Sequence, residues 1–149
     1  MKRQRQGGFL IAKIHQTAGR IFNRMLKDHG ITELNTAQGR IMFVLWRHDG
    51  IPISDLAAKS GLEKSTLTSM LDRMEEAGFL CRTPSPDDRR KILIFRTEKD
   101  RSFQARYVEV SEEMARIFYR GFTDDEIARF EVDLERILDN LTPPPSARS

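Results

Sequence analysis

Cysteine and histidine are scarce in this sequence, which holds Cys81 alone and three scattered histidines, His15, His29 and His48. A single cysteine excludes an internal disulfide, and the spacing of these residues matches no zinc site. Glycine-rich phosphate loops and the Gly-x-Ser-x-Gly turn of hydrolases are also missing. No identifiable motif places paired carboxylates, or a nucleophile with its base. We therefore expect neither enzyme activity nor a metal or cofactor.

Long apolar runs are missing too. No run approaches the roughly 20 residues needed to span a bilayer. Four apolar residues follow the basic segment 1–8 before Lys13 interrupts them, too few for a signal-peptide core. We expect a cytoplasmic protein with no membrane partner. With 149 residues, 39% of them hydrophobic and 32% charged, the chain suits a single globular domain, residues 1–149.

The net charge of +3 says little about function, but its distribution is uneven. Residues 1–29 carry seven Lys and Arg against one acid, whereas residues 123–139 carry seven acids against two arginines. These two segments are complementary, which favours their packing together within or between chains. Residues 30–97, with ten basic and nine acidic residues, are balanced, so bulk charge does not single them out as DNA-binding.

Apolar periodicity and capping signals predict five long helices and a short one. The long helices are expected at 9–28, 35–48, 63–77, 98–120 and 124–141, and the short one from an N-cap at Ser54 to Gly61. Capping-box spacing marks two starts, Asn35 with Gln38 and Thr123 with Glu126. Strand character appears at 51–53, 79–83 and 91–96, with a hairpin loop between the last two.

Residues 53–72 fit the frame of a helix-turn-helix. Ala57 is small enough for the second helix to approach the first, and Gly61 can take the left-handed conformation of the turn. Ser60 stands where the frame normally has an apolar residue. The alternative is an ordinary helical hairpin with a glycine turn. The residues expected to lock the two helices together are Leu56, Leu62, Leu67 and Met70.

The helix at 63–77 is expected to bury Leu67, Met70, Leu71 and Met74. Its opposite face is rich in small hydroxyls, which can reach base edges when the N-terminal half of a helix enters the major groove. The acids Glu75 and Glu76 stand at the far end. Glu63 is a discordant acid at the near end, either a cap or an acceptor for cytosine. Capping alone explains Ser65 or Thr66 but not the later hydroxyls. The candidate DNA contacts in this region are Ser54, Lys64, Ser65, Thr66, Thr68, Ser69 and Arg73.

The hairpin loop supplies a wing. Arg89, Arg90 and Lys91 are consecutive at its tip, and a flexible arginine there can enter a narrow, electronegative minor groove. Asp88 can hold Arg90 by a charge-assisted hydrogen bond and preset its direction. The alternative is a solvated run of charges.

With these motifs in place, the chain resembles the MarR family of bacterial and archaeal regulators over about residues 9–141. Asp88-Arg89-Arg90 is similar to the family's Asp-x-Arg wing signature. It follows a helix ending in residues 71–78 and the strand residue Arg82, and residues 97–99 resemble the start of the family's long dimerisation helix. Gly39 departs from the family, where a bulky apolar residue is usual. So do Arg96 and Asp100, where leucine and glycine are common.

The resemblance implies a mainly α fold with a small β-hairpin wing (α+β). Residues 35–97 would form the winged helix-turn-helix lobe, residues 9–34 and 98–141 the dimerisation helices, and residues 142–149 an extended tail. Arg90 would be the minor-groove arginine with Asp88 as its partner. Residues 63–77 would be the major-groove helix.

The terminal helices have narrow apolar seams, which need a partner. A two-fold dimer would offer two recognition helices to major grooves roughly 34–36 Å apart, so the expected target is pseudo-palindromic. The alternative is a monomer with a helical cap. The expected dimer contacts are Leu10, Ile14, Ile21, Met114, Ile117, Ile127, Phe130, Leu134, Ile137, Leu138 and Leu141.

The resemblance also implies a ligand in the cleft beside the winged lobe, for which we expect a small aromatic or phenolic effector. Gly39 opens space near this cleft, and the other candidate residues are His15, Met42 and Tyr107. His15 is otherwise a structural histidine. Cys81 is expected to pack as a small hydrophobe, with a redox switch as the alternative.

Together these features predict a sequence-specific regulator of transcription, most simply a ligand-responsive repressor. It would bind double-stranded DNA as a homodimer. Two alternatives remain: a winged-helix module that binds proteins, and a redox-sensing regulator based on Cys81.

Overall fold

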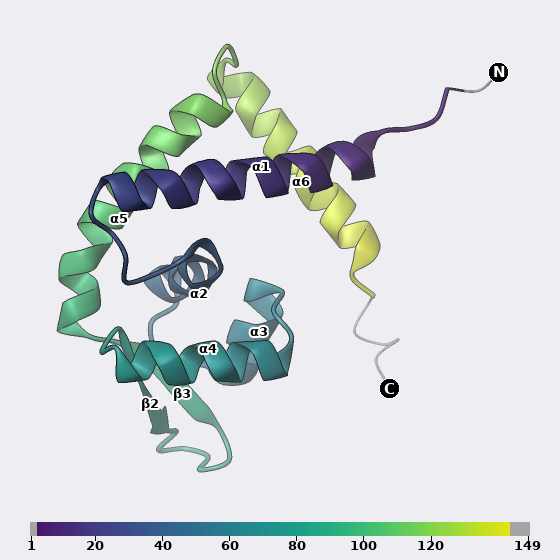
Figure 1. Cartoon of the computed structure of the whole chain (residues 1–149). Coiled ribbons are helices and arrows are strands. Elements are labelled where there is room, and N and C mark those ends of the chain that lie inside the picture. Colours follow the sequence, from purple (N-terminus) through teal and green to yellow (C-terminus); the bar gives the residue numbers. More distant parts are fainter. Residues whose placement is uncertain (1–2, 144–149) are drawn as a thin grey trace. The chain divides into compact units, whose positions relative to one another are not determined.

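The computed structural model describes residues 3–143, and Figure 1 shows a mainly helical chain with a small sheet. The helices are α1 (Gly7–Asp28), α2 (Thr36–Arg47), α3 (Ile53–Ser60), α4 (Lys64–Glu76), α5 (Glu98–Phe118) and α6 (Asp124–Leu141). The strands are β1 (Ile51–Pro52), β2 (Leu80–Pro84) and β3 (Ile92–Arg96). This arrangement confirms the expected fold class. Most of the expected tail, from residue 144 onward, lies outside the described residues.

Both expected capping boxes are present. At the start of α2, Asn35 Oδ1 accepts from the Gln38 backbone N–H at 2.8 Å, and Gln38 Oε1 accepts from the Asn35 N–H at 3.0 Å. Thr123 and Glu126 make the same reciprocal pair at α6. Each pair satisfies backbone donors that the helix leaves free, and so fixes where the helix begins.

The start of α3 differs from the expectation. The helix begins at Ile53 directly after β1, and its N-cap position is Pro52. Ser54 therefore lies in the first turn and is not the cap, and Ile53 is helical rather than extended. The reason is the sheet, because Pro52 pairs with Leu93 and ends the strand two residues before Ser54.

The sheet has the order β1-β3-β2 with antiparallel neighbours. Ile94 of the central strand faces Ile51 on one side and Arg82 on the other, and it is fully buried. Helices α2, α3 and α4 close the core against the sheet with Ile41, Leu56 and Leu67, which are also fully buried. The helix-turn-helix is thus built on one contiguous apolar core.

A buried polar cluster joins β3 to α5. The carboxylate of Asp100, fully buried, accepts from Trp46 Nε1 at 2.9 Å and from Arg96 Nε at 2.5 Å. Arg96 Nη2 donates to Gln104 Oε1 at 2.5 Å. Two of the three residues that depart from the family pattern, Arg96 and Asp100, therefore form one ion pair with each other.

Two compact units make up the chain, with the boundary inside α5. The first runs to Glu112 and holds α1 to α4, the sheet and most of α5; the second begins at Glu113 and holds α6. The single domain expected from the sequence stays a prediction. Among residues 3–143, no helix is both long and apolar enough to cross a membrane.

Candidate nucleic-acid interface

The turn between α3 and α4 has the geometry that a helix-turn-helix requires. Gly61 ends α3 with φ of 70°, in the left-handed region that glycine adopts without strain. Ser60, the polar residue in the apolar frame, is buried, and its hydroxyl donates to the Ala57 carbonyl at 3.3 Å and accepts from the Leu62 N–H at 3.4 Å. A serine is tolerated there because both interactions are local.

Helix α4 buries one face and exposes the hydroxyl-rich one, as expected. Leu67, Leu71 and Met74 are buried, whereas Met70 is only half-buried. Glu63 occupies the N-cap position, as one of its two expected roles requires, but its side chain makes no capping hydrogen bond. The residues expected to contact DNA are all exposed on this helix: Lys64, Ser65, Thr66, Thr68, Ser69 and Arg73.

The hydroxyl of Thr68 donates a hydrogen bond within the helix. Its Oγ1 donates to the Lys64 carbonyl at 2.8 Å, one helical turn back. The oxygen keeps its acceptor lone pairs, so in this rotamer Thr68 offers an acceptor and a methyl group to a base edge. An acceptor suits the exocyclic amino group of adenine or cytosine in the major groove.

The wing carries the arginine in the expected arrangement. Asp88 Oδ1 accepts from both the backbone N–H of Arg90 at 3.1 Å and its Nε at 3.2 Å, which confirms the predicted hydrogen bond. These bonds hold the pKa of the Asp88 carboxyl below its usual range. Asp88 thus fixes the direction of the Arg90 guanidinium. Because the Arg90 side chain is 91% exposed, the guanidinium remains accessible to a ligand. Arg89 and Lys91 are exposed beside it.

Ser85 fixes this turn, a role that the sequence did not reveal. It is buried, its N–H donates to the Lys91 carbonyl at 2.8 Å, and its hydroxyl lies 3.3 and 3.4 Å from the N–H groups of Asp87 and Asp88. The Lys91 N–H closes the turn onto the Asp88 carbonyl at 2.9 Å. The position of Ser85 between two prolines was the available signal, because hydroxyl residues stabilise such turns.

Arg82 is a second missed residue. Its Nη2 lies 2.6 Å from Asp72 Oδ1 and 3.1 Å from Glu75 Oε1, so β2 is tied to α4 by ion pairs. Glu75 was expected at the far end of the helix, and no partner was assigned to it. The signal in the sequence was the spacing of Asp72 and Glu75, which places both on neighbouring turns.

Cys81 is exposed, so the expectation that it packs as a buried hydrophobe is wrong. It pairs with Phe95 in the sheet register, and both side chains are exposed. Strand side chains alternate between faces, and Leu80 takes the buried face of β2. The alternation along β2 could not decide which of Leu80 and Cys81 would be buried.

The expected effector cleft is not open at Gly39. A Cβ atom built there would lie 1.8 Å from the Tyr107 hydroxyl oxygen, so the tyrosine occupies the space that the glycine leaves. Tyr107 is buried between the rings of Phe22 and Trp46, at centroid distances of 5.5 and 5.4 Å, and burial raises its pKa to about 12. Met42 is buried as well, whereas His15 is exposed.

A cavity of about 380 Å³ lies elsewhere, between the end of α1 and the start of α2. None of the four expected effector residues lines it. Its walls are formed by Asn23, Leu26, Lys27, Ile31, Thr32, Leu34, Asn35 and Gln38.

Gly39→Ala tests this packing. We expect the variant to lower the free energy of unfolding by about 1–3 kcal/mol, because the added methyl overpacks the core against Tyr107. Thermal and urea unfolding measure the change. Gly19→Ala on α1 is the control, since no described atom beyond its chain neighbours and the nearby backbone of its own helix lies within 4 Å of its added Cβ, and it should unfold no more easily than the wild type. Equal destabilisation in the two variants would contradict the close contact.

The residues expected at a dimer interface all remain accessible on the single chain. On α1, Leu10, Ile14 and Ile21 are 46%, 42% and 39% exposed, and the exposed fractions on α6 reach 75% at Leu141. Ile117, Ile137 and Leu138 are exposed too. Met114, Ile127, Phe130 and Leu134 are half-buried.

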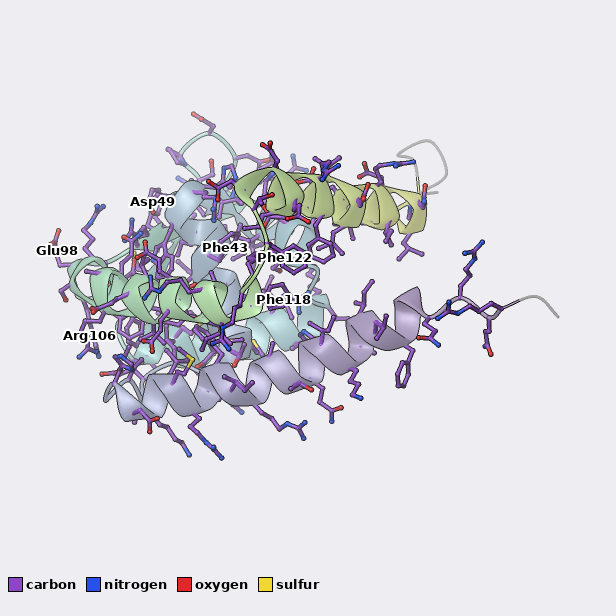
Figure 2. The ribbon with its side chains drawn as sticks, turned by 90° about the horizontal axis from the view of Figure 1, so that it is seen from above. Phe43, Asp49, Glu98, Arg106, Phe118 and Phe122 are labelled. Atoms are coloured by element: carbon purple, nitrogen blue, oxygen red, sulfur yellow. The ribbon has the colours of Figure 1, made fainter. Side chains whose placement is uncertain are left out.

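An aromatic cluster closes the turn between α5 and α6. Tyr119 packs edge-on against Phe118 and Phe122, with centroid distances of 4.9 and 6.1 Å, and Figure 2 shows Phe118 and Phe122 near each other there. Its hydroxyl donates to Glu131 Oε2 at 2.8 Å. Phe122 is half exposed, which extends the accessible apolar surface of this unit.

Comparisons with known proteins agree on one family. The sequence profile of the MarR family matches residues 34–92. The regulator TtmR of Methylorubrum extorquens (strain PA1) is 31% identical over 88 residues, 59% of this chain, and the chain spans only 44% of that relative's length. The homoprotocatechuate degradative operon repressor of Escherichia coli is 27% identical over 128 residues, covering 86% of this chain and 84% of the repressor.

A solved structure extends the similarity to three dimensions. The crystal structure of a mutant of E. coli MarR, in which a serine replaces a cysteine, was determined in complex with operator DNA. It superposes on this chain with a TM-score of 0.76 at 25% identity. The match covers 88% of this chain and 92% of the other.

Proposed function

The chain belongs to the MarR family, and we propose that it is a transcription regulator which binds a pseudo-palindromic operator as a homodimer and represses transcription. The observation that carries the proposal is the wing tip, where Asp88 directs an exposed Arg90 away from the protein. A fixed backbone with an accessible guanidinium suits insertion into a narrow minor groove.

The second element of the interface is α4. Its N-terminal half exposes Lys64 and a set of hydroxyls, and no acid lies between Lys64 and Ser69. Recognition helices enter the major groove by this half. We expect Lys64 to contact a phosphate, and Thr68, whose hydroxyl proton is donated to the Lys64 carbonyl, to accept from a base edge.

The exposed apolar residues of α1, α5 and α6 support the homodimer. Large exposed apolar surfaces are rare on monomeric proteins and mark interaction sites. A second copy of the chain that covers them would carry a second recognition helix and wing. The two half-sites would then explain a pseudo-palindromic target.

Ile137→Asp is expected to convert the dimer into a monomer, because a carboxylate would be buried without a partner in the apolar contact. The fold of the single chain should survive, since Ile137 is 44% exposed there. Val132→Asp is the matched control, as Val132 is 55% exposed but lies off the apolar seam of α6. Sedimentation velocity measures both. A dimeric Ile137→Asp variant would contradict this interface.

For the effector, we propose a small aromatic or phenolic acid that favours one spacing of the two recognition helices. One relative is a repressor of a homoprotocatechuate degradative operon, and homoprotocatechuate is a phenolic acid. Since Tyr107 fills the space at Gly39, such a ligand needs room elsewhere or a shift of that ring. A library of aromatic acids that leaves DNA affinity unchanged would remove this part of the proposal.

The first experiment is fluorescence anisotropy with the duplex upstream of the chain's own gene and a scrambled duplex, across a salt series. Tight binding to the first duplex with a steep salt dependence is expected, because phosphate contacts release counterions. Absence of binding at low salt would favour the protein-interaction alternative.

A further inference from the structure

We propose that Arg82 is a positioning residue for DNA binding, which fixes the wing relative to the recognition helix so that both can engage the duplex together. The inference rests on the proposed function. It concerns the ion-pair cluster formed by Arg82 on β2 with Asp72 and Glu75 on α4, called here the helix–wing clamp.

The helix–wing clamp joins α4 to the strand backbone and not only to a flexible side chain. Glu75 Oε2 accepts from the Arg82 backbone N–H at 2.8 Å, while Oε1 lies 3.3 Å from Nε and 3.1 Å from Nη2 of the same residue. Asp72 adds a contact of 2.6 Å to Nη2. One carboxylate therefore fixes both the strand and the direction of the guanidinium, and the second carboxylate limits its rotation.

The clamp lies between the two elements that are proposed to touch DNA. Arg82 is opposite Ile94 in the hairpin, and three residues later Ser85 begins the turn that carries Asp88 and Arg90. Figure 1 shows the hairpin extending beyond α4, with this turn at its far end. A small rotation of β2 becomes a larger displacement at the turn. The clamp acts on the middle residue of β2, three residues before Ser85.

The exposure of the three side chains favours a geometric role over a stabilising one. Those of Arg82, Glu75 and Asp72 are 27%, 36% and 59% exposed. Ion pairs this accessible contribute little to folding stability. The hydrogen bonds between the two residues nevertheless lower the pKa of Glu75 and raise that of Arg82, so this pair stays charged at neutral pH.

An effect of charge alone and a positioning role predict opposite changes in DNA affinity when Glu75 is neutralised, so one variant can distinguish them. Neutralising an acid near DNA removes repulsion from phosphate and should strengthen binding. If Glu75 acts through Arg82 to hold the wing, Glu75→Gln should weaken binding despite the lost negative charge. Glu76→Gln is the matched control, because it removes the same charge from an exposed neighbour outside the clamp.

The experiment measures affinity of the full-length wild type and both variants for the duplex upstream of the chain's own gene, by anisotropy at one salt concentration. We expect Glu75→Gln to bind roughly threefold to tenfold more weakly, and Glu76→Gln to bind equally or more tightly. Thermal unfolding checks that the two variants remain folded to the same extent.

A double-mutant cycle with Arg90→Ala identifies the wing as the element affected. Removing Arg90 should weaken binding several-fold less in the Glu75→Gln background than in the wild type, because the wing is already displaced. If the wild type binds and Glu75→Gln behaves as Glu76→Gln does, the inference about Arg82 is wrong and the proposed function stands. If the wild type binds no duplex, both fail.

Discussion

Arg90→Ala is expected to weaken operator binding by about tenfold or more for each half-site, while the unfolding temperature stays unchanged. The guanidinium is almost fully exposed, and within the described part of the chain its side-chain bonds run only to Asp88 two residues away, so the fold loses little. The operator loses a cation from its most electronegative groove in both halves of the dimer. Anisotropy and thermal unfolding of the same preparations measure the two effects.

Two further variants separate the effect of the Arg90 side-chain direction on DNA affinity from the effect of local charge. Glu76→Ala should not weaken binding, because the distal end of α4 is acidic and lies away from the entering half of the helix. Asp88→Asn removes a negative charge near DNA but also releases the Arg90 side chain. Weaker binding by Asp88→Asn would support the preset direction of Arg90. Equal losses in Arg90→Ala and Glu76→Ala would count against the docking of the wing.

Asp100→Ala is expected to give the largest loss of stability, about 3–5 kcal/mol in the free energy of unfolding. The variant leaves the Arg96 guanidinium, whose side chain is 10% exposed, without its carboxylate, and Trp46 Nε1 without its acceptor. Removing one partner of a buried pair costs far more than the pair contributes, because a desolvated charge remains. The midpoint of thermal unfolding should fall by roughly 10 °C.

The matched control for this cluster restores the residues common in the family. Arg96→Leu with Asp100→Gly removes both charges together, so no unpaired ion remains in the core. We expect this double variant to unfold at a higher temperature than Asp100→Ala. An Asp100→Ala variant as stable as the double variant would show that the Arg96 guanidinium is satisfied without Asp100, by Gln104, which also accepts a hydrogen bond from it.

Much of the fold follows from signals that act over a few residues. The capping boxes at Asn35 and Thr123 and the glycine at 61 appear in the structure where the sequence places them. The wing hydrogen bond between Asp88 and Arg90 belongs to the same group, since its partners are two residues apart. Such interactions need no knowledge of the tertiary fold, because the local backbone brings the groups together.

Two predictions were wrong because they depended on contacts with distant parts of the chain: which face of β2 is buried, and where α3 begins. The alternation of a strand predicts that one of Leu80 and Cys81 is buried, but the choice depends on what covers the sheet. The start of α3 was missed for a related reason, as pairing between Pro52 and Leu93 ends β1 before the serine signal can act. In both places a contact with a distant strand or helix outweighs the local preference.

The helices, the turn of the helix-turn-helix and the charged wing tip follow from local signals in the amino-acid sequence, and with them the kind of protein this is. Long-range packing places the Tyr107 ring in the space at Gly39, brings Trp46 to the ion pair of Asp100 and Arg96, and ties the wing to α4 through Arg82. The Tyr107 and Trp46 contacts join residues that are far apart in the chain, and periodicity does not show them. The spacing of Arg96 to Asp100 and of Asp72 to Glu75 is visible in the sequence, but it does not show which side chains the fold brings to them. Their positions are set by how the helices pack on the sheet, which is a property of the whole core.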